Sequence, residues 1–195
     1  MSIEIIRNNF VEAQKVLNEF ISEPKNFETI LNAGNLIADA IRNGNKILSC
    51  GNGGSMCDSM HFAEEMTGRF RRNRKALPAF AMADASHITC SANDYGYEAV
   101  FSRYVEAFGA EGDVLLALST SGNSPNIVNA ANVAKNRGMK IIGLTGKGGG
   151  ILAGICDVEI RVDHLGWSDR IQEIHIKIIH TLIDYVETEL GVGQE

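Results

Sequence analysis

Positive charge and long apolar runs are both scarce in this chain of 195 residues. Acidic residues outnumber basic ones, and the formal net charge is -6 at pH 7. The longest basic run, Arg69–Lys75, is typical of a solvated loop and not of a nucleic-acid-binding surface, although Arg69 is a candidate to assist an anionic ligand. No uncharged apolar run approaches membrane-spanning length, and the first residues lack the apolar segment of a signal peptide. The sequence therefore predicts a cytoplasmic protein with no nucleic-acid partner and no membrane partner.

Closely spaced cysteine pairs are absent as well. The four cysteines, Cys50, Cys57, Cys90 and Cys156, form no Cys-x-x-Cys pair and follow no regular spacing. Each of them stands among apolar or small residues. We expect four buried free thiols.

Short apolar strands alternate with helical segments over most of the chain. The strands are continuous apolar runs, as a parallel sheet covered on both faces requires. At 45% apolar content, residues 1–195 are enough for one domain with a substantial core. We predict an α/β domain with a doubly wound, flavodoxin-like sheet of about five parallel strands. The strands are expected at 46–50, 78–83, 113–118, 139–145 and 157–162, and the helices between them at 54–67, within 86–108, at 125–137 and near 148–153.

Two helices are predicted before the first strand and one long helix after the last. Apolar residues recur every three or four positions from Ile3 to about Ile21, and Pro24 then breaks the pattern. A second helix is expected from about 26 to 42 and a final one from about 168 to 190. The final helix is apolar around much of its circumference, more than one small sheet can cover. We therefore predict a homo-oligomer, with the helical pair of residues 1–43 packed between subunits and sites completed across the interfaces.

Two loops rich in glycine and hydroxyl groups each follow a predicted strand and precede a predicted helix. They are Gly51–Ser55 and Ser119–Ser124. Backbone N–H groups at a helix N-terminus, with hydroxyls beside them, suit a phosphate or carboxylate. The glycines of the first loop could merely permit a tight turn and Ser124 could be only an N-cap, but four hydroxyls in the second loop exceed what capping needs. The first loop lacks the Walker pattern and the full dinucleotide fingerprint, so we expect a phosphorylated small molecule and not a nucleotide.

A histidine and a carboxylate share one face of the helix that follows the first loop. His61 and Glu65 are four residues apart, and Asp58 and Arg69 extend the same row. Such a pair can be half of a metal site, a base with its orienting partner, or an ordinary solvent-facing polar pair. Glu64 is expected to point away from His61, because adjacent residues differ by about 100° around a helix.

The last helix offers two further histidines. Gln172, His175 and His180 could lie within one broad face. His175 could join a salt-bridge row with Glu173 or Asp184. His180 lies in an apolar run, where it is expected to be at least half buried and to need a polar partner. Helical spacing alone does not choose between the two histidines.

These residues resemble the motifs of the sugar isomerase (SIS) family, and within it the phosphoheptose isomerases, over almost the whole chain. The resemblance implies an aldose–ketose isomerase acting on sedoheptulose 7-phosphate, at the entry to heptose synthesis for bacterial surface glycans such as lipopolysaccharide. It rests on Cys50–Ser55, His61–Arg69, Ser91–Gly96, Ser119–Ser124, Leu144–Gly146 and Asp169–His175.

The resemblance also implies roles for individual residues. Moving a carbonyl between C1 and C2 needs a base and a proton shuttle, and these fall to Glu65 and His180. Asn93 and Asp94, which could equally form an Asx turn, would contact sugar hydroxyls. The phosphate would be held by Ser55, Ser119, Thr120, Ser121 and Ser124, and the remaining substrate contacts would come from Asn52, Gly53, Gly54, Glu65, Asp169 and Gln172.

The family further implies a Zn²⁺ ion in each subunit of a homotetramer. Its ligands would be His61, Glu65, Gln172 and His180, a plausible donor set for zinc. The main rival is a non-catalytic protein of the same fold, such as a replication-initiator-associating factor. Such a protein has no need of His61, Glu65 and His180 together.

Overall fold

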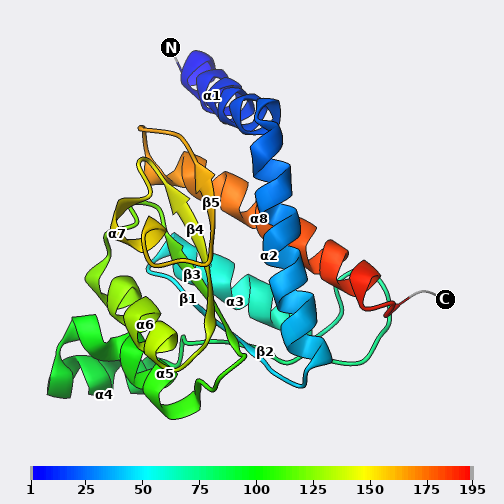
Figure 1. Cartoon of the computed structure of the whole chain (residues 1–195). Coiled ribbons are helices and arrows are strands. Elements are labelled where there is room, and N and C mark those ends of the chain that lie inside the picture. The colour runs from blue at the N-terminus through cyan, green and yellow to red at the C-terminus, as the bar shows by residue number, and fades with distance from the viewer. Residues whose placement is uncertain (1, 194–195) are drawn as a thin grey trace.

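The computed structural model describes residues 2–193, and its centre is a five-stranded sheet in which every pairing is parallel (Figure 1). The α/β prediction is confirmed, with strand ends within about two residues of those expected. The elements in chain order are α1 (Ser2–Ser22), α2 (Pro24–Arg42), β1 (Ile47–Cys50), α3 (Gly54–Thr67), β2 (Ala79–Ala81), α4 (Ala85–Tyr95), the 3-10 turn η1 (Tyr97–Ala99), α5 (Val100–Phe108), β3 (Val114–Ser119), α6 (Pro125–Asn136), β4 (Lys140–Gly146), α7 (Gly150–Ala153), β5 (Val158–Val162) and α8 (Ser168–Glu189).

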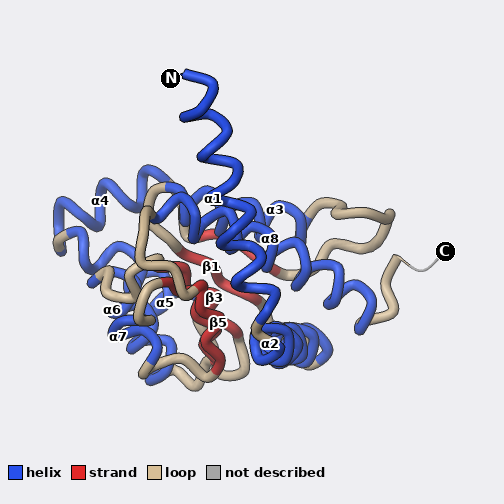
Figure 2. The backbone as a smooth tube through the Cα atoms, turned by 90° about the horizontal axis from the view of Figure 1, so that it is seen from above, coloured by secondary structure: helices blue, strands red, loops and turns tan. Residues whose placement is uncertain are grey.

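Helices cover both faces of the sheet, so that successive strand residues enter different cores (Figure 2). Ile47 of β1 packs with α2, α3 and α8, whereas Leu48 packs with α5 and α6 on the other face. Both side chains are fully buried. This two-sided burial is the reason that the strands are continuous apolar runs in the sequence.

The strand order β2-β1-β3-β4-β5 reverses direction between β1 and β3. The chain steps from β1 to one neighbour, β2, and then returns to pair β3 against the opposite side of β1. The carboxyl ends of β1 and β3 therefore meet at the topological switch point, where open α/β sheets bind ligands. Both glycine- and hydroxyl-rich loops follow these two strands.

The first helix extends away from the rest of the molecule (Figures 1 and 2). Only Val16 and Phe20 of α1 are buried, while Ile6 is 60% and Phe10 75% exposed. Pro24 begins α2 instead of leaving a gap before it, because proline lacks the N–H that the first turn of a helix leaves unpaired. Within residues 2–193, no helix combines the length and apolar character needed to cross a bilayer.

The four cysteines are free, but the prediction that all are buried is wrong. Cys50 in β1 is buried and Cys156 is partly buried. Cys57 and Cys90 are exposed, because they lie on outward faces of α3 and α4. Small or apolar sequence neighbours did not reveal which face of a helix a cysteine occupies.

Candidate active site

The first loop packs closely against the start of α8. Gly53 has φ of +56°, a conformation that glycine adopts without strain. A Cβ on Gly54 would come within 2.6 Å of the Gln172 side chain, whose amide nitrogen donates to Ser55 Oγ at 3.3 Å. Asn52 exchanges hydrogen bonds with Asn126 on α6. The glycines thus allow α8 to approach the loop, and Gln172 is one of the groups that line it.

The second loop keeps its hydroxyl groups at the edge of the sheet. Ser119 and Ser124 lie 3.1 Å apart through their Oγ atoms, and Thr120 Oγ1 donates to Ser168 Oγ at 3.2 Å. Ser121 Oγ accepts a hydrogen bond from the N–H of Asn123. Ser124 occupies the N-cap position of α6, yet its side chain makes no capping hydrogen bond. The Ser124 hydroxyl therefore remains free of the capping role that the sequence left open for it.

Two helices bring an imidazole pair and a carboxylate together. His61 Nε2 on α3 lies 2.9 Å from His180 Nε2 on α8, and 3.6 Å from Glu65 Oε1. The Glu65 side chain is 18% exposed and the His61 side chain 38% exposed, so the cluster is open on one side. Burial and the neighbouring His61 lower the pKa of His180 below its usual value, which favours its neutral form. A neutral imidazole can accept a proton, donate one, or bind a metal.

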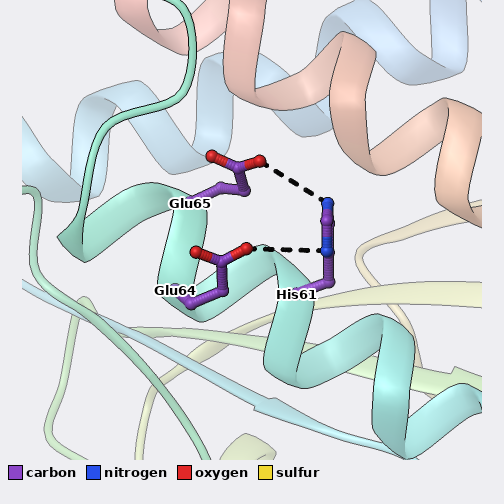
Figure 3. Close-up of side chains that lie close together, drawn as sticks. All are labelled: His61, Glu64 and Glu65. Carbon is purple, nitrogen blue, oxygen red and sulfur yellow. Dashed lines mark ion pairs between the residues drawn. The ribbon is translucent and has the colours of Figure 1, made fainter.

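Glu64 also faces His61, contrary to the sequence prediction. Its Oε1 lies 3.5 Å from His61 Nδ1, while Glu65 approaches the other ring nitrogen (Figure 3). Residues three apart on a helix are neighbours as much as residues four apart, and the flexible side chain covers the remaining angle. His61, Glu64 and Glu65 together could hold a metal ion.

His175 faces the core, not a surface salt-bridge row as one reading of the sequence had it. It is fully buried, its Nε2 lies 2.9 Å from the carbonyl oxygen of Thr145, and its Nδ1 has no hydrogen-bond partner among residues 2–193. Burial lowers the pKa of His175 to about 4. The neutral ring donates through Nε2 and ties α8 to the carboxyl end of β4.

The buried His175 predicts a pH-dependent stability. Its pKa is about 4 in the folded chain and about 6.5 unfolded, so the unfolded state binds the proton more readily between these values. The contribution of neutral His175 to the free energy of unfolding is fully present above pH 6.5 and is lost as the pH falls toward 4. The loss between pH 7 and pH 5 is about 2 kcal/mol. Denaturant unfolding of the parent and of His175→Gln at both pH values measures this loss, which the variant should not show. Equal pH slopes would contradict the assignment.

The remaining predicted residues lie farther out. Asn93 and Asp94 are exposed at the end of α4, where Asn93 Nδ2 donates to Asp94 Oδ1 at 2.9 Å. Asp169 is exposed at the start of α8 and accepts a hydrogen bond from the N–H of Arg170. Arg69 is exposed after α3. The contacts of the chain itself do not bring these four residues to the His61 cluster.

Sequence reasoning missed the residues that hold Asn52 in place. Asn52 Nδ2 donates to Asn126 Oδ1 at 2.9 Å, and Asn52 Oδ1 accepts from Asn126 Nδ2 at 2.8 Å and from the Tyr97 hydroxyl at 3.0 Å. Asn126 is almost completely buried. Its position just inside α6, beside the hydroxyl-rich loop, was the one available signal.

Comparison with known proteins identifies the family of the chain. The SIS domain family matches residues 9–146. The phosphoheptose isomerase of Histophilus somni is 58% identical over 191 residues, covering 98% of both chains. The chain belongs to the phosphoheptose isomerase family. The fold of the family is shared throughout, since a phosphoheptose isomerase structure from Neisseria gonorrhoeae superposes with a TM-score of 0.90 at 40% identity, covering 96% of this chain and 100% of that one. The corresponding structure from Francisella tularensis gives 0.91 at 35% identity, covering 96% and 99%.

Membership of the phosphoheptose isomerases confirms the resemblance and the enzyme class predicted from the sequence. It also weighs against the non-catalytic rival, since relatives over nearly the full length are isomerases. The sheet-edge loops and the His61 cluster are accordingly the candidate binding and acid–base parts of a phosphoheptose isomerase site.

Proposed function

We propose that this chain interconverts sedoheptulose 7-phosphate and D-glycero-D-manno-heptose 7-phosphate, as a step toward the heptose of bacterial lipopolysaccharide or a related surface glycan. The observation that carries the proposal is the convergence of His61, Glu65 and His180 from α3 and α8. A protein that only binds sugar phosphates needs the loops but has no use for this cluster.

The reaction moves a carbonyl from C2 to C1 of the open-chain sugar. Glu65 removes a proton from C1, the C1–C2 bond becomes the double bond of an enediol, and the proton returns to C2. His180, held neutral, transfers the remaining proton between the two oxygens or opens the sugar ring. The proton lost from C1 is balanced by the one gained at C2, and ketose and aldose are isomers, so no redox partner is needed.

The loops supply binding energy at the far end of the substrate. Ser55, with the hydroxyls of the second loop, would hold the phosphate at the N-termini of α3 and α6. Asn52, Asn93, Asp94, Asp169 and Gln172 would contact sugar hydroxyls. Fixing a remote phosphate orients the reacting carbons, which is an effective use of binding energy.

Incubation with sedoheptulose 7-phosphate in deuterated water tests the function. NMR should reveal an aldose product that carries deuterium at C2, because the proton removed from C1 exchanges with solvent on the base. Product without label would point to internal proton transfer or a hydride shift. Absence of any aldose, with zinc supplied, would reject the enzyme.

We also propose that the site holds Zn²⁺. Tetrahedral Zn–N bonds of 2.0–2.1 Å place two ligand atoms roughly 3.3 Å apart. The His61–His180 and His61–Glu65 separations of 2.9 and 3.6 Å bracket that value, so these three side chains fit. The proposed fourth ligand, Gln172, lies about 12 Å along α8 from His180 and its amide is held at Ser55, so it does not reach the other three ligands within one chain and would have to come from a second copy. When bound, zinc would polarise the sugar carbonyl as a Lewis acid.

Removal of zinc is expected to lower kcat at least tenfold, since Lewis-acid polarisation contributes several kcal/mol to a charged transition state. Dialysis against a chelator, followed by activity and metal analysis, measures the effect. Zn²⁺ should restore the activity, whereas Mg²⁺, which prefers oxygen ligands, should not. Full turnover by the metal-free protein would exclude an essential Lewis acid.

We further propose a homo-oligomer, a tetramer by family resemblance, with α1 and α2 at its interfaces. The exposed apolar residues of α1 support it, among them Ile3, Ile6 and Phe10. The geometry of α3 also supports an oligomer. Ser55, proposed to bind the phosphate, and Glu65, the proposed base, are separated by roughly 15 Å of helix. An extended heptose phosphate spans only roughly 10 Å at C–C bond lengths of about 1.5 Å. A second copy would then supply part of each site, and light scattering of the parent and a Phe10→Glu variant tests the assembly.

A cytoplasmic location also remains part of the proposal. The exposed free thiols Cys57 and Cys90 support it, because reducing compartments preserve such groups.

A further inference from the structure

The loop after α3 contains a buried arginine. The sequence predicted that Arg69–Lys75 is a solvated loop, and this is wrong for Arg74, whose side chain is 1% exposed. Its neighbours Arg71 and Arg72 are exposed, as predicted. Burial of a guanidinium is costly unless its five N–H groups find acceptors.

Arg74 uses these groups to close the end of α3. Nη2 donates to the carbonyl oxygen of Glu65 at 2.8 Å, and Nη1 to that of Met66 at 2.9 Å and of Gly68 at 3.2 Å. The last carbonyls of a helix have no partner within the helix, and a cation there is also favoured by the helix dipole. Arg74 therefore fixes the backbone of Glu65, the proposed base.

The same guanidinium is joined to α8. Arg74 Nε lies 2.5 Å from Glu187 Oε1, and the Glu187 side chain is only 7% exposed. Glu187 follows His180 by seven residues, which is two turns, so both lie on nearly the same side of α8. One planar group thus connects the end of α3 that carries His61 and Glu65 with the helix that carries His180.

A buried ion pair is not by itself strong evidence for stability, because desolvation offsets much of the attraction. An apolar side chain in this place would not orient the two helices. The planar guanidinium of Arg74 does, because its hydrogen bonds have a fixed geometry that sets the position of α3 relative to α8. The His61–His180 contact of 2.9 Å depends on that position.

We propose that Arg74, clamped by Glu187, is a positioning residue that holds α3 and α8 at the spacing at which Glu65, His61 and His180 can share a metal ion and a substrate. The role rests on the proposed function. Arg74 itself touches neither, since its side chain is 1% exposed and its N–H groups are taken up by Glu187 and by backbone carbonyls.

Arg74→Lys tests the proposal, because lysine retains the charge and can pair with Glu187 but cannot serve the three carbonyl groups together. We expect kcat to fall at least tenfold, KM for sedoheptulose 7-phosphate to stay within about twofold, and the dissociation constant for Zn²⁺, measured by chelator competition, to rise about 10- to 100-fold. A purely structural role would lower the melting temperature without changing the zinc affinity of the folded protein.

Arg42→Lys is the control for an arginine fork at a helix end, with a side chain that is 43% exposed. Arg42 also joins a helix end to α8, with Nη2 donating to Glu189 Oε1 at 2.5 Å and to the Glu189 carbonyl at 2.8 Å, but its helix, α2, carries no site residue. We expect this variant to keep the parent kcat and zinc affinity. If Arg74→Lys does not fold, Glu187→Gln, which retains an acceptor for Nε without the charge, should show the same pattern at about threefold.

The proposal is overturned if a folded Arg74→Lys, or Glu187→Gln in its place, matches an active parent in kcat and zinc affinity. It is also overturned if the Arg42 control loses both to the same degree. An inactive parent that binds no zinc would instead overturn the proposed function, and with it this role of Arg74, so the two failures are distinguishable.

Discussion

Replacing Glu65 with glutamine is expected to lower kcat by about 10²- to 10⁴-fold, the usual contribution of a positioned general base. The amide has nearly the shape of the carboxylate but cannot take the proton from C1. Its oxygen can still act as a weak metal ligand, so zinc content, measured alongside kcat, separates loss of the base from loss of the metal. Deuterium incorporation at C2 should disappear together with turnover.

Glu64→Gln is the control for this experiment. Glu64 lies on the same turn of α3, its side chain is 63% exposed, and it approaches the other nitrogen of His61. We expect its kcat to remain within a few-fold of the parent. Parent-like turnover by Glu65→Gln would remove Glu65 from the role of base, and a large effect of Glu64→Gln alone would transfer that role to its neighbour.

Gly122→Ala is expected to destabilise the protein by more than about 3 kcal/mol, and to raise KM for the sugar phosphate at least tenfold in whatever fraction folds. Gly122 has φ of +65°, and an added Cβ would lie directly against the carbonyl oxygen of Gly149. The two loops cannot move apart independently, because they are joined by hydrogen bonds. The Leu152 N–H donates to the Gly122 carbonyl at 2.9 Å, and the Ile151 N–H donates to Asn123 Oδ1 at 3.0 Å. The change would therefore displace the hydroxyl-rich loop from α7.

Gly44→Ala is the control that measures the cost of the left-handed backbone conformation without a steric clash. Gly44 has φ of +80°, but an added Cβ there would meet no atom within 4 Å. We expect a loss of about 1–2 kcal/mol from the left-handed conformation alone, with KM unchanged. Chemical denaturation measures the free energy of unfolding of both variants. If Gly122→Ala loses no more stability than Gly44→Ala, the loop accommodates the added methyl group without strain.

Local patterns in the sequence were sufficient for the fold. Continuous apolar strands such as Val114–Ser119 predict a sheet covered on both faces, and the glycine and hydroxyl loops mark where the strands end. Pro24 shows the limit of such signals, since it can end one helix or begin the next and here does the second. The choice depends on how α2 packs, which no local pattern contains.

The candidate site, too, could be predicted from local patterns only in part. The spacing of His61 and Glu65 reveals a shared helix face, but the approach of His180, 119 residues later, depends on tertiary packing. That partnership came from family resemblance, not from spacing. The burial of Arg74 and His175 escaped prediction for a related reason, because both donate hydrogen bonds to backbone carbonyls, which carry no sequence signal, and the other partner of Arg74, Glu187, is 113 residues away.

The position of α8 has a consequence for how the chain is made. It is the last of the described elements to leave the ribosome, yet its buried residues, such as Ile179 and Leu182, complete the core against α2, α3 and the sheet. Until α8 emerges, the part of those earlier elements that packs against it stays exposed. The nascent chain therefore exposes apolar surface until late in synthesis, which is the stage at which it is most prone to aggregate.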